Sequence, residues 1–179
     1  MTHFHFTSSL SVVLRWLVLA AMMFGSIGSA LAGETYSDNG DGTVTDPTTG
    51  LIWKRCSEGQ VWDGATSACT GTNTPYAFDN ANALTGTVTF AGQSDWRVPN
   101  IRELQTIVDR SVVSPTIDKA AFPNTTTSCV WSDTADFSIA GNAWSVNFSY
   151  GNADSTSQAS TPVRYVLCGL DKQPFKQLY

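Results

Sequence analysis

Four cysteines, at positions 56, 69, 129 and 168, restrict the fold of this 179-residue chain more than any other feature. In an exported chain an even number of cysteines indicates disulfide bonds, and four cysteines allow three pairings. We favour a bond between Cys56 and Cys69, because the loop between them is rich in Gly, Ser and Thr. The second bond would then join Cys129 to Cys168. A zinc site of four thiolates is disfavoured, because the sequence lacks paired C-x-x-C spacings.

Export is predicted by the first 32 residues. Arg15 precedes an apolar stretch, and small residues then lead to Ala30-Leu31-Ala32. A basic flank, a short apolar core and an A-x-A site are typical of a cleaved secretory signal. A membrane anchor is the alternative, but a spanning helix needs about 20 predominantly apolar residues, and glycines and serines interrupt this stretch. We expect a signal peptide at residues 1–32 and a single domain at residues 33–179, which would be secreted, periplasmic or at the cell surface.

Cleavage of the signal would also remove both histidines, His3 and His5, and one basic residue, Arg15, from a chain of net charge −5. A chain without histidine cannot run a Ser-His-Asp or Cys-His mechanism or build the usual His-containing zinc site. An acidic chain also lacks the clustered Lys and Arg that nucleic acid requires. We therefore expect no enzymatic activity, no cofactor, no metal site and no nucleic acid partner, and no membrane span once the signal is removed.

A first helix is predicted between Thr74 and Gly86. Thr74 suits an N-cap, Pro75 suits the first helical position, and Gly86 suits the end of a helix. Apolar residues recur three apart within this segment: Phe78, Ala81 and Leu84.

A second helix is predicted to begin after Asn100. Pro99 keeps the preceding residue extended, Asn100 is a favourable N-cap, and Glu103 follows three residues later, as in a capping box. We expect the Arg97 side chain to pair with a backbone carbonyl or with a carboxylate such as Asp95 or Glu103. We interpret this junction as scaffolding. Apolar residues share one face of a helix that continues to Arg110: Ile101, Leu104, Ile107 and Val108.

Strand-forming runs occupy both ends of the predicted domain. Residues 43–45 and 51–53 are flanked by the turn dipeptides Asn39-Gly40 and Asp41-Gly42, which predicts a hairpin. The acidic residues there also resemble a calcium loop, but glycine occupies two positions of the ligand pattern, so turn chemistry is favoured. Further runs typical of strands lie at residues 129–132, 143–148 and 163–168.

Several segments, in this order, resemble the Lcl C-terminal domain family of bacteria: "DNGDGTVTDPTTGLIW", "SDWRVPNIRELQTIVD", "VWSDT", "AWSVNFSYG" and "VRYVLC". The resemblance spans about residues 36–168. It implies an α+β fold of the C-type lectin-like kind, in which two helices flank a small twisted antiparallel sheet with long loops. Two predicted helices and several short strands fit this class.

The resemblance implies a role in binding. The family is named for the terminal domain of a collagen-like adhesin, which is described as binding sulfated polysaccharides. An acidic chain does not suit that ligand. We expect an exported, non-catalytic binding module for cell-surface adhesion or ligand recognition, with a surface polymer, a glycan or a protein as partner. A self-associating structural or filament subunit is the alternative, because exposed strand edges support assembly into homo-oligomers.

An oxidase of the formylglycine-generating type is a third, weaker alternative. Residues 141–148 echo a segment of those enzymes, but Ser145 stands where they carry a glutamate. Their chemistry also needs reactive cysteines, and the four cysteines here are assigned to disulfide bonds.

Candidate ligand-binding residues are aromatic side chains in polar, glycine-bearing loops, where a ring is free to stack on a sugar. Trp62 and Tyr150 meet this condition. Asn147, Asn152 and Asp154 would supply hydrogen bonds beside Tyr150.

Overall fold

The computed structural model describes residues 36–158, 164–165 and 169–170. The expected signal at residues 1–32 lies outside this part, so the division into signal and domain stays a prediction. None of the helices in the described part has the length and apolar character that crossing a membrane requires.

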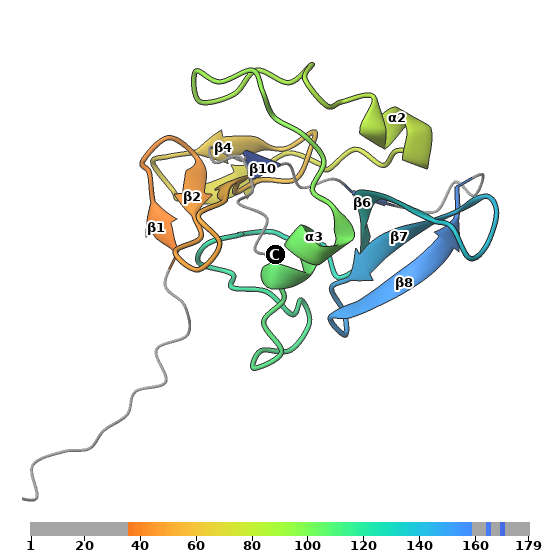
Figure 1. Ribbon diagram of the computed structural model, residues 1–179. Helices are drawn as coiled ribbons and strands as arrows, with labels where there is room; N and C mark the ends of the chain where they lie inside the picture. Colours follow the sequence, from red (N-terminus) through yellow and green to blue (C-terminus); the bar gives the residue numbers. More distant parts are fainter. Residues whose placement is uncertain (1–35, 159–163, 166–168, 171–179) are drawn as a thin grey trace, which may run out of the picture. The chain divides into compact units, whose positions relative to one another are not determined.

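Short strands form three separate sheets (Figure 1). The first has the order β1-β2-β3-β10, all antiparallel, and consists of β1 (Ser37–Asp38), β2 (Thr43–Thr45), β3 (Ile52–Lys54) and β10 (Gly169–Leu170). The second is the hairpin of β4 (Val61–Asp63) and β5 (Ala68–Thr70). The third has the order β8-β7-β6-β9 and consists of β6 (Cys129–Asp136), β7 (Asn142–Asn147), β8 (Asn152–Ser157) and β9 (Arg164–Tyr165).

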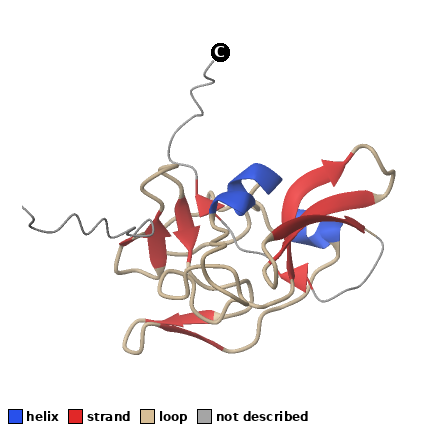
Figure 2. Cartoon of the chain, turned by 90° about the horizontal axis from the view of Figure 1, so that it is seen from below, coloured by secondary structure: helices blue, strands red, loops and turns tan. Residues whose placement is uncertain are grey.

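Two short helices accompany these sheets, α2 (Phe78–Asn82) and α3 (Ile101–Thr106), so the predicted α+β class is confirmed. The strands do not form one antiparallel sheet, however, because they separate into three and β9 pairs parallel to β6. Figure 2 shows the long loops, in tan, that connect the elements.

The first helix begins later than its sequence predicts. Helix α2 starts at Phe78, so the prediction of Thr74 as N-cap and Pro75 as first helical residue is wrong. Tertiary hydrogen bonds explain the difference. The carbonyl of Tyr76 accepts from Nε1 of Trp131 at 2.9 Å, and the amide of Thr74 donates to a distant carbonyl, which holds this segment extended.

The second helix begins as predicted. The Asn100 side chain accepts from the Glu103 amide at 2.9 Å, and the Glu103 carboxylate accepts from the Asn100 amide at 2.8 Å, which is a capping box. Arg97 adds a two-pronged ion pair, with both distances to the Glu103 oxygens at 2.7 Å. The scaffolding interpretation of this junction is consistent with these bonds, because Asn100 and both charged side chains are engaged in them.

The same helix ends four residues earlier than its apolar pattern predicts. The last helical residue is Thr106, and Ile107 leaves helical geometry. Beyond it the amide of Asp109 donates to the carbonyl of Thr116, and Arg110 donates to the carbonyl of Gly151. These bonds to distant segments replace the next turn of helix.

The core consists of two clusters of buried side chains. Trp53 and Phe122 lie in the first, together with residues of α3, β6 and β7, and Trp96 and Trp131 lie in the second, beside α2. Trp131, on β6, is fully buried. Helix α3 packs against β6 and β7 of the third sheet.

The predicted disulfide between Cys56 and Cys69 is present and ties the segment after β3 to β5. Disulfides persist in oxidising compartments, which suits an exported protein. Cys129 is buried at the start of β6 and forms no disulfide within the described residues. Cys168 lies outside them, so its pairing with Cys129 stays a prediction.

Candidate functional site

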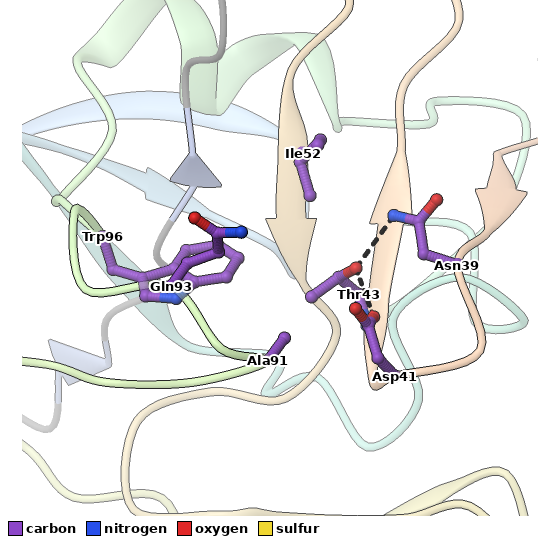
Figure 3. A pocket seen from close by; sticks show the side chains of 7 residues that line it. All are labelled: Asn39, Asp41, Thr43, Ile52, Ala91, Gln93 and Trp96. Atoms are coloured by element: carbon purple, nitrogen blue, oxygen red, sulfur yellow. Dashed lines mark hydrogen bonds between the residues drawn. The ribbon is translucent and has the colours of Figure 1, made fainter.

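A pocket of about 240 Å³ lies between the β1–β2 hairpin and a loop fifty residues further along the chain. Figure 3 shows side chains of the hairpin on one side, Gln93 and Trp96 on the other, and Ile52 of β3 between them. Seven residues line it: Asn39, Asp41, Thr43, Ile52, Ala91, Gln93 and Trp96. The lining combines one carboxylate, two amides and one hydroxyl with apolar groups.

The hairpin side of the pocket is fixed by its own turn. Asp41 Oδ1 accepts from the amide of Thr43 at 3.0 Å and from its hydroxyl at 2.6 Å. Asn39 donates from Nδ2 to the same hydroxyl at 2.8 Å (Figure 3) and accepts from the Thr45 hydroxyl at 3.2 Å. The predicted turn chemistry of this acidic segment is confirmed, because its side chains are bonded to the chain of the turn itself.

The opposite side is a tight turn at residues 90–93. Phe90 and Gln93 exchange both backbone hydrogen bonds at 3.0 Å, and Ala91 and Gly92 have φ values of +51° and +71°. Two successive positive φ values are typical of a type I′ turn. Trp96 is 1% exposed and donates from Nε1 to the Phe90 carbonyl at 3.0 Å, so a core side chain anchors the turn that presents Gln93.

The pocket retains hydrogen-bonding groups that the described chain does not use. The side-chain amide of Gln93 is exposed and makes no hydrogen bond to the described residues, and Oδ2 of Asp41 has no partner among them. A ligand in this pocket would therefore meet one amide, one carboxylate oxygen and an apolar contact from the half-buried Ile52. The lining is thus mainly polar, which suits a ligand rich in hydrogen-bonding groups.

Gly42 lies where two aromatic rings pack on the backbone of the β1–β2 turn. It has a φ of +86°, and a Cβ at this position would lie 2.8 Å from the rings of both Phe90 and Trp62. The rings thus pack directly on the backbone of the β1–β2 turn. The guanidinium of Arg55 covers Trp62 at 4.2 Å from the ring centre. The packing of Phe90 on Gly42 sets the distance between the two sides of the pocket, since Gly42 belongs to the β1–β2 turn and Phe90 to the 90–93 turn.

Replacing Gly42 with alanine is expected to destabilise the protein by about 1–3 kcal/mol more than replacing Gly40 does, the usual cost of overpacking. Both glycines have positive φ, so backbone strain is matched, but nothing lies within 4 Å of a Cβ at Gly40. Urea unfolding of the two variants measures the difference. Equal midpoints and equal slopes for Gly42→Ala and Gly40→Ala would contradict the close packing at Gly42.

The predicted site around Tyr150 forms one end of the β7–β8 hairpin. Tyr150 is 72% exposed in the connecting turn, as a stacking platform requires. Asn147 and Asn152 lie opposite each other across the two strands, and Asp154 lies opposite Ser145 on the same face. The structure brings these four predicted residues together, with Tyr150 and Asn152 exposed and Asn147 and Asp154 half-buried.

Trp62, the fifth predicted residue, lies on β4 in a different sheet. It is half-buried, because Gly42 and Arg55 cover parts of its ring. It is therefore a neighbour of the pocket wall, separate from the Tyr150 hairpin.

A second hollow of about 240 Å³ lies beside the first sheet. Arg55 donates to Asp38 at 2.7 Å there and to the carbonyls of Ala120 and Ala121. A hydrogen bond from the Gly40 amide, with the nearby Arg55 charge, lowers the pKa of Asp38. These polar groups are already paired with one another, so this hollow offers fewer contacts to a ligand.

No group of three or more His, Cys, Asp or Glu side chains in the described part of the chain is arranged to hold a metal ion. Near the start of α3, desolvation raises the pKa of Asp133, and the Glu103 carboxylate adds to the effect. The backbone amide of Asp133 donates to the Pro99 carbonyl, so this residue helps to hold the segment that precedes α3.

The pocket side chains Asn39, Asp41 and Gln93 were not predicted as site residues. The local signals were the turn dipeptides Asn39-Gly40 and Asp41-Gly42. Nothing in the sequence relates the turn at residues 90–93 to the hairpin at residues 39–43.

A sequence model of the Lcl C-terminal domain matches residues 42–168, more than half of the chain. No match was found among curated proteins, and none among solved structures.

Proposed function

Because the chain belongs to the Lcl C-terminal domain family, we propose that it is an exported, non-catalytic binding module that recognises a polar ligand, with a glycan as first candidate. The proposed context is adhesion or ligand recognition at the cell surface. The family that the resemblance over about residues 36–168 predicted is confirmed by the match over residues 42–168. A surface polymer or a protein partner belongs to the same proposal.

The observation that carries the proposal is the pocket between the β1–β2 hairpin and the 90–93 turn. The Gln93 amide offers a donor and an acceptor, and the Asp41 carboxylate offers an acceptor, beside the half-buried apolar Ile52. Sugars present hydroxyls at their rim and C–H groups on their faces, so both kinds of group find a complement here.

The composition of the lining supports binding over catalysis. Asp41 is the one ionisable side chain among the described residues that line the pocket. General acid–base catalysis commonly uses a second titratable group within hydrogen-bond reach of the reacting atoms. Both histidines of the chain lie within the first five residues, in the predicted signal.

The C-type lectin-like arrangement is part of the proposal. Its support is the pairing of β10 with β3, which joins the late part of the chain to the sheet formed by its first strands. The disulfide Cys56–Cys69 supports export, to the exterior, the periplasm or the cell surface.

The charge of the chain narrows the ligand class. The net charge is −5, and the one charged group in the pocket is Asp41. A neutral or basic sugar suits this pocket better than a sulfated polysaccharide, because an anionic polymer requires a positive surface. Nucleic acid is unexpected for the same reason.

Binding to a glycan array, with and without calcium, tests the proposal. We expect the purified chain to bind at least one neutral or basic glycan, and Gln93→Ala to weaken that binding at least about tenfold, equivalent to about 1.4 kcal/mol. Asp41→Asn, which keeps Oδ1 for the Thr43 bonds, should weaken it as well.

Gln105→Ala is the matched control, because Gln105 is an exposed glutamine on α3, away from the pocket lining. Tyr150→Ala separates the two candidate sites: a loss confined to this variant would move the site to the β7–β8 hairpin. No detectable binding on the array and in a screen of surface polymers would contradict the binding proposal.

A further inference from the structure

Strand β8 is the outer strand of its sheet and pairs with β7 alone in the described part of the chain. Natural proteins protect such an edge with lysine, proline or a bulge. The sequence of β8, Asn-Ala-Asp-Ser-Thr-Ser, contains no lysine or proline, and its pairing with β7 is regular over six residues without a bulge. Its one charged side chain is Asp154. The edge therefore remains competent to pair with another strand.

The backbone groups that point outward from β8 follow from the register. Gln158 donates its amide to the Gly141 carbonyl at 2.7 Å, which places a hydrogen-bonded pair at that end of the hairpin. Such pairs recur at every second position of an antiparallel ladder. The remaining residues, Ala153, Ser155 and Ser157, direct their amides and carbonyls away from β7.

Exposed apolar side chains gather at both ends of this edge. Tyr150, 72% exposed, lies in the turn that precedes β8. Phe137, 96% exposed, and Ile139, 52% exposed, lie in the β6–β7 turn, which Gln158 joins to the other end of β8. These are three of the five exposed large apolar residues in the described chain.

The turn that carries Phe137 is held in a defined shape. Asp136 accepts from the Ser138 amide at 2.9 Å, from its hydroxyl at 2.6 Å and from the Ser155 hydroxyl of β8 at 2.6 Å. A fixed turn loses little conformational entropy when it binds, so a fully exposed phenylalanine on it is a favourable anchor.

We propose that β8 is a dimerisation edge, along which a second copy of this chain adds its own β8 antiparallel about a two-fold axis. Antiparallel pairing places the start of one strand beside the end of the other. The β7–β8 turn of one copy, with Tyr150, then lies at the same end of the interface as the β6–β7 turn of the second copy, with Phe137 and Ile139. Each copy thus supplies both halves of an isologous contact.

Charge selects the register. In the dimer, residues whose amides point away from β7 must pair with such residues of the second copy. Near the middle of β8 this condition allows two positions of the two-fold axis, between two copies of Asp154 or between two copies of Ser155. The first option places two carboxylates directly opposite each other, which is destabilising. The second places Asp154 opposite Thr156 of the second copy, and we assign the axis to Ser155.

This inference goes beyond the proposed binding function and does not depend on it. The pocket belongs to the first sheet and the 90–96 segment, while β8 belongs to the third sheet. A dimer would present two pockets to a polymeric ligand, which raises avidity without new contacts.

Sedimentation of the purified chain between about 1 µM and about 1 mM, the range of weak protein contacts, tests the inference. We expect a monomer–dimer equilibrium. Ala153→Pro removes an outward amide that the pairing uses, and proline is tolerated at such a position of an edge strand. This variant should stay monomeric throughout, whereas Ala153→Ser, which keeps the amide, should dimerise like the parent chain.

Phe137→Ser keeps the inference testable if Ala153→Pro fails to fold, because a side chain that is 96% exposed contributes little to the monomer. We expect its dimer dissociation constant to rise at least about tenfold, as for an interface anchor. Val113→Ser, which removes another exposed apolar residue from a different loop, should leave the constant unchanged. A parent chain that is monomeric at every concentration, or a folded Ala153→Pro variant that still dimerises, overturns the inference, and so does an unchanged constant in Phe137→Ser when Ala153→Pro does not fold.

Discussion

Replacing Arg97 with alanine is expected to lower the free energy of unfolding by up to about 3 kcal/mol, the lower end of the cost of removing one partner from a buried ion pair, because the Arg97 side chain itself is 27% exposed. The Glu103 side chain is 5% exposed, and it accepts from both guanidinium nitrogens and from the Asn100 amide. Without Arg97 its charge would remain in the interior with a single backbone donor. The start of α3 and its packing on β6 and β7 depend on this carboxylate.

Urea unfolding followed by circular dichroism measures the effect. Arg102→Ala is the matched control. Arg102 is exposed on α3, and its replacement removes the same charge from the chain. Arg97→Lys should recover only part of the loss, since an ammonium cannot donate in the two-pronged geometry. Similar unfolding midpoints for Arg97→Ala and Arg102→Ala would show that the pair contributes no more than a surface charge.

The beginning of α3 was predictable because its determinants are local. Pro99, Asn100 and Glu103 lie within five residues, and the capping box that they specify is present. The end of the helix was not predictable, because the amide of Asp109 bonds to Thr116 and the apolar pattern contains no trace of that bond. Helix α2 was misplaced for the same reason, since Trp131 takes the Tyr76 carbonyl from 55 residues away.

The candidate site residues also differ in whether local sequence or distant contacts determine them. Tyr150 was chosen because its loop is polar, and local composition does predict exposure. Trp62 was chosen in the same way, but Arg55 stacks on its ring, a contact that only the folded chain reveals. The pocket escaped prediction because Asp41 and Gln93 line it from two segments fifty residues apart, which the rings of Phe90 and Trp62 join by packing on Gly42.

Removing the Cys56–Cys69 disulfide is expected to cost about 3 kcal/mol of stability, given the short loop that it closes. The double variant Cys56→Ala/Cys69→Ala tests this, because both cysteines are buried and alanine introduces no polar group. The β4–β5 hairpin should respond first, since within the described chain it pairs with no other strand and a lone two-stranded hairpin is marginally stable.

Hydrogen exchange separates a local from a global effect. In the double variant the amides of β4 and β5 should exchange faster than those of β6 and β7, which serve as the internal control. Other contacts already hold the hairpin, among them Arg55 on Trp62 and the Asn124 side chain on the Cys69 carbonyl at 2.8 Å. If these suffice, exchange and unfolding would match the parent chain, and the disulfide would be dispensable. If they do not, Trp62 loses its place against Gly42, and the wall of the pocket depends on the disulfide.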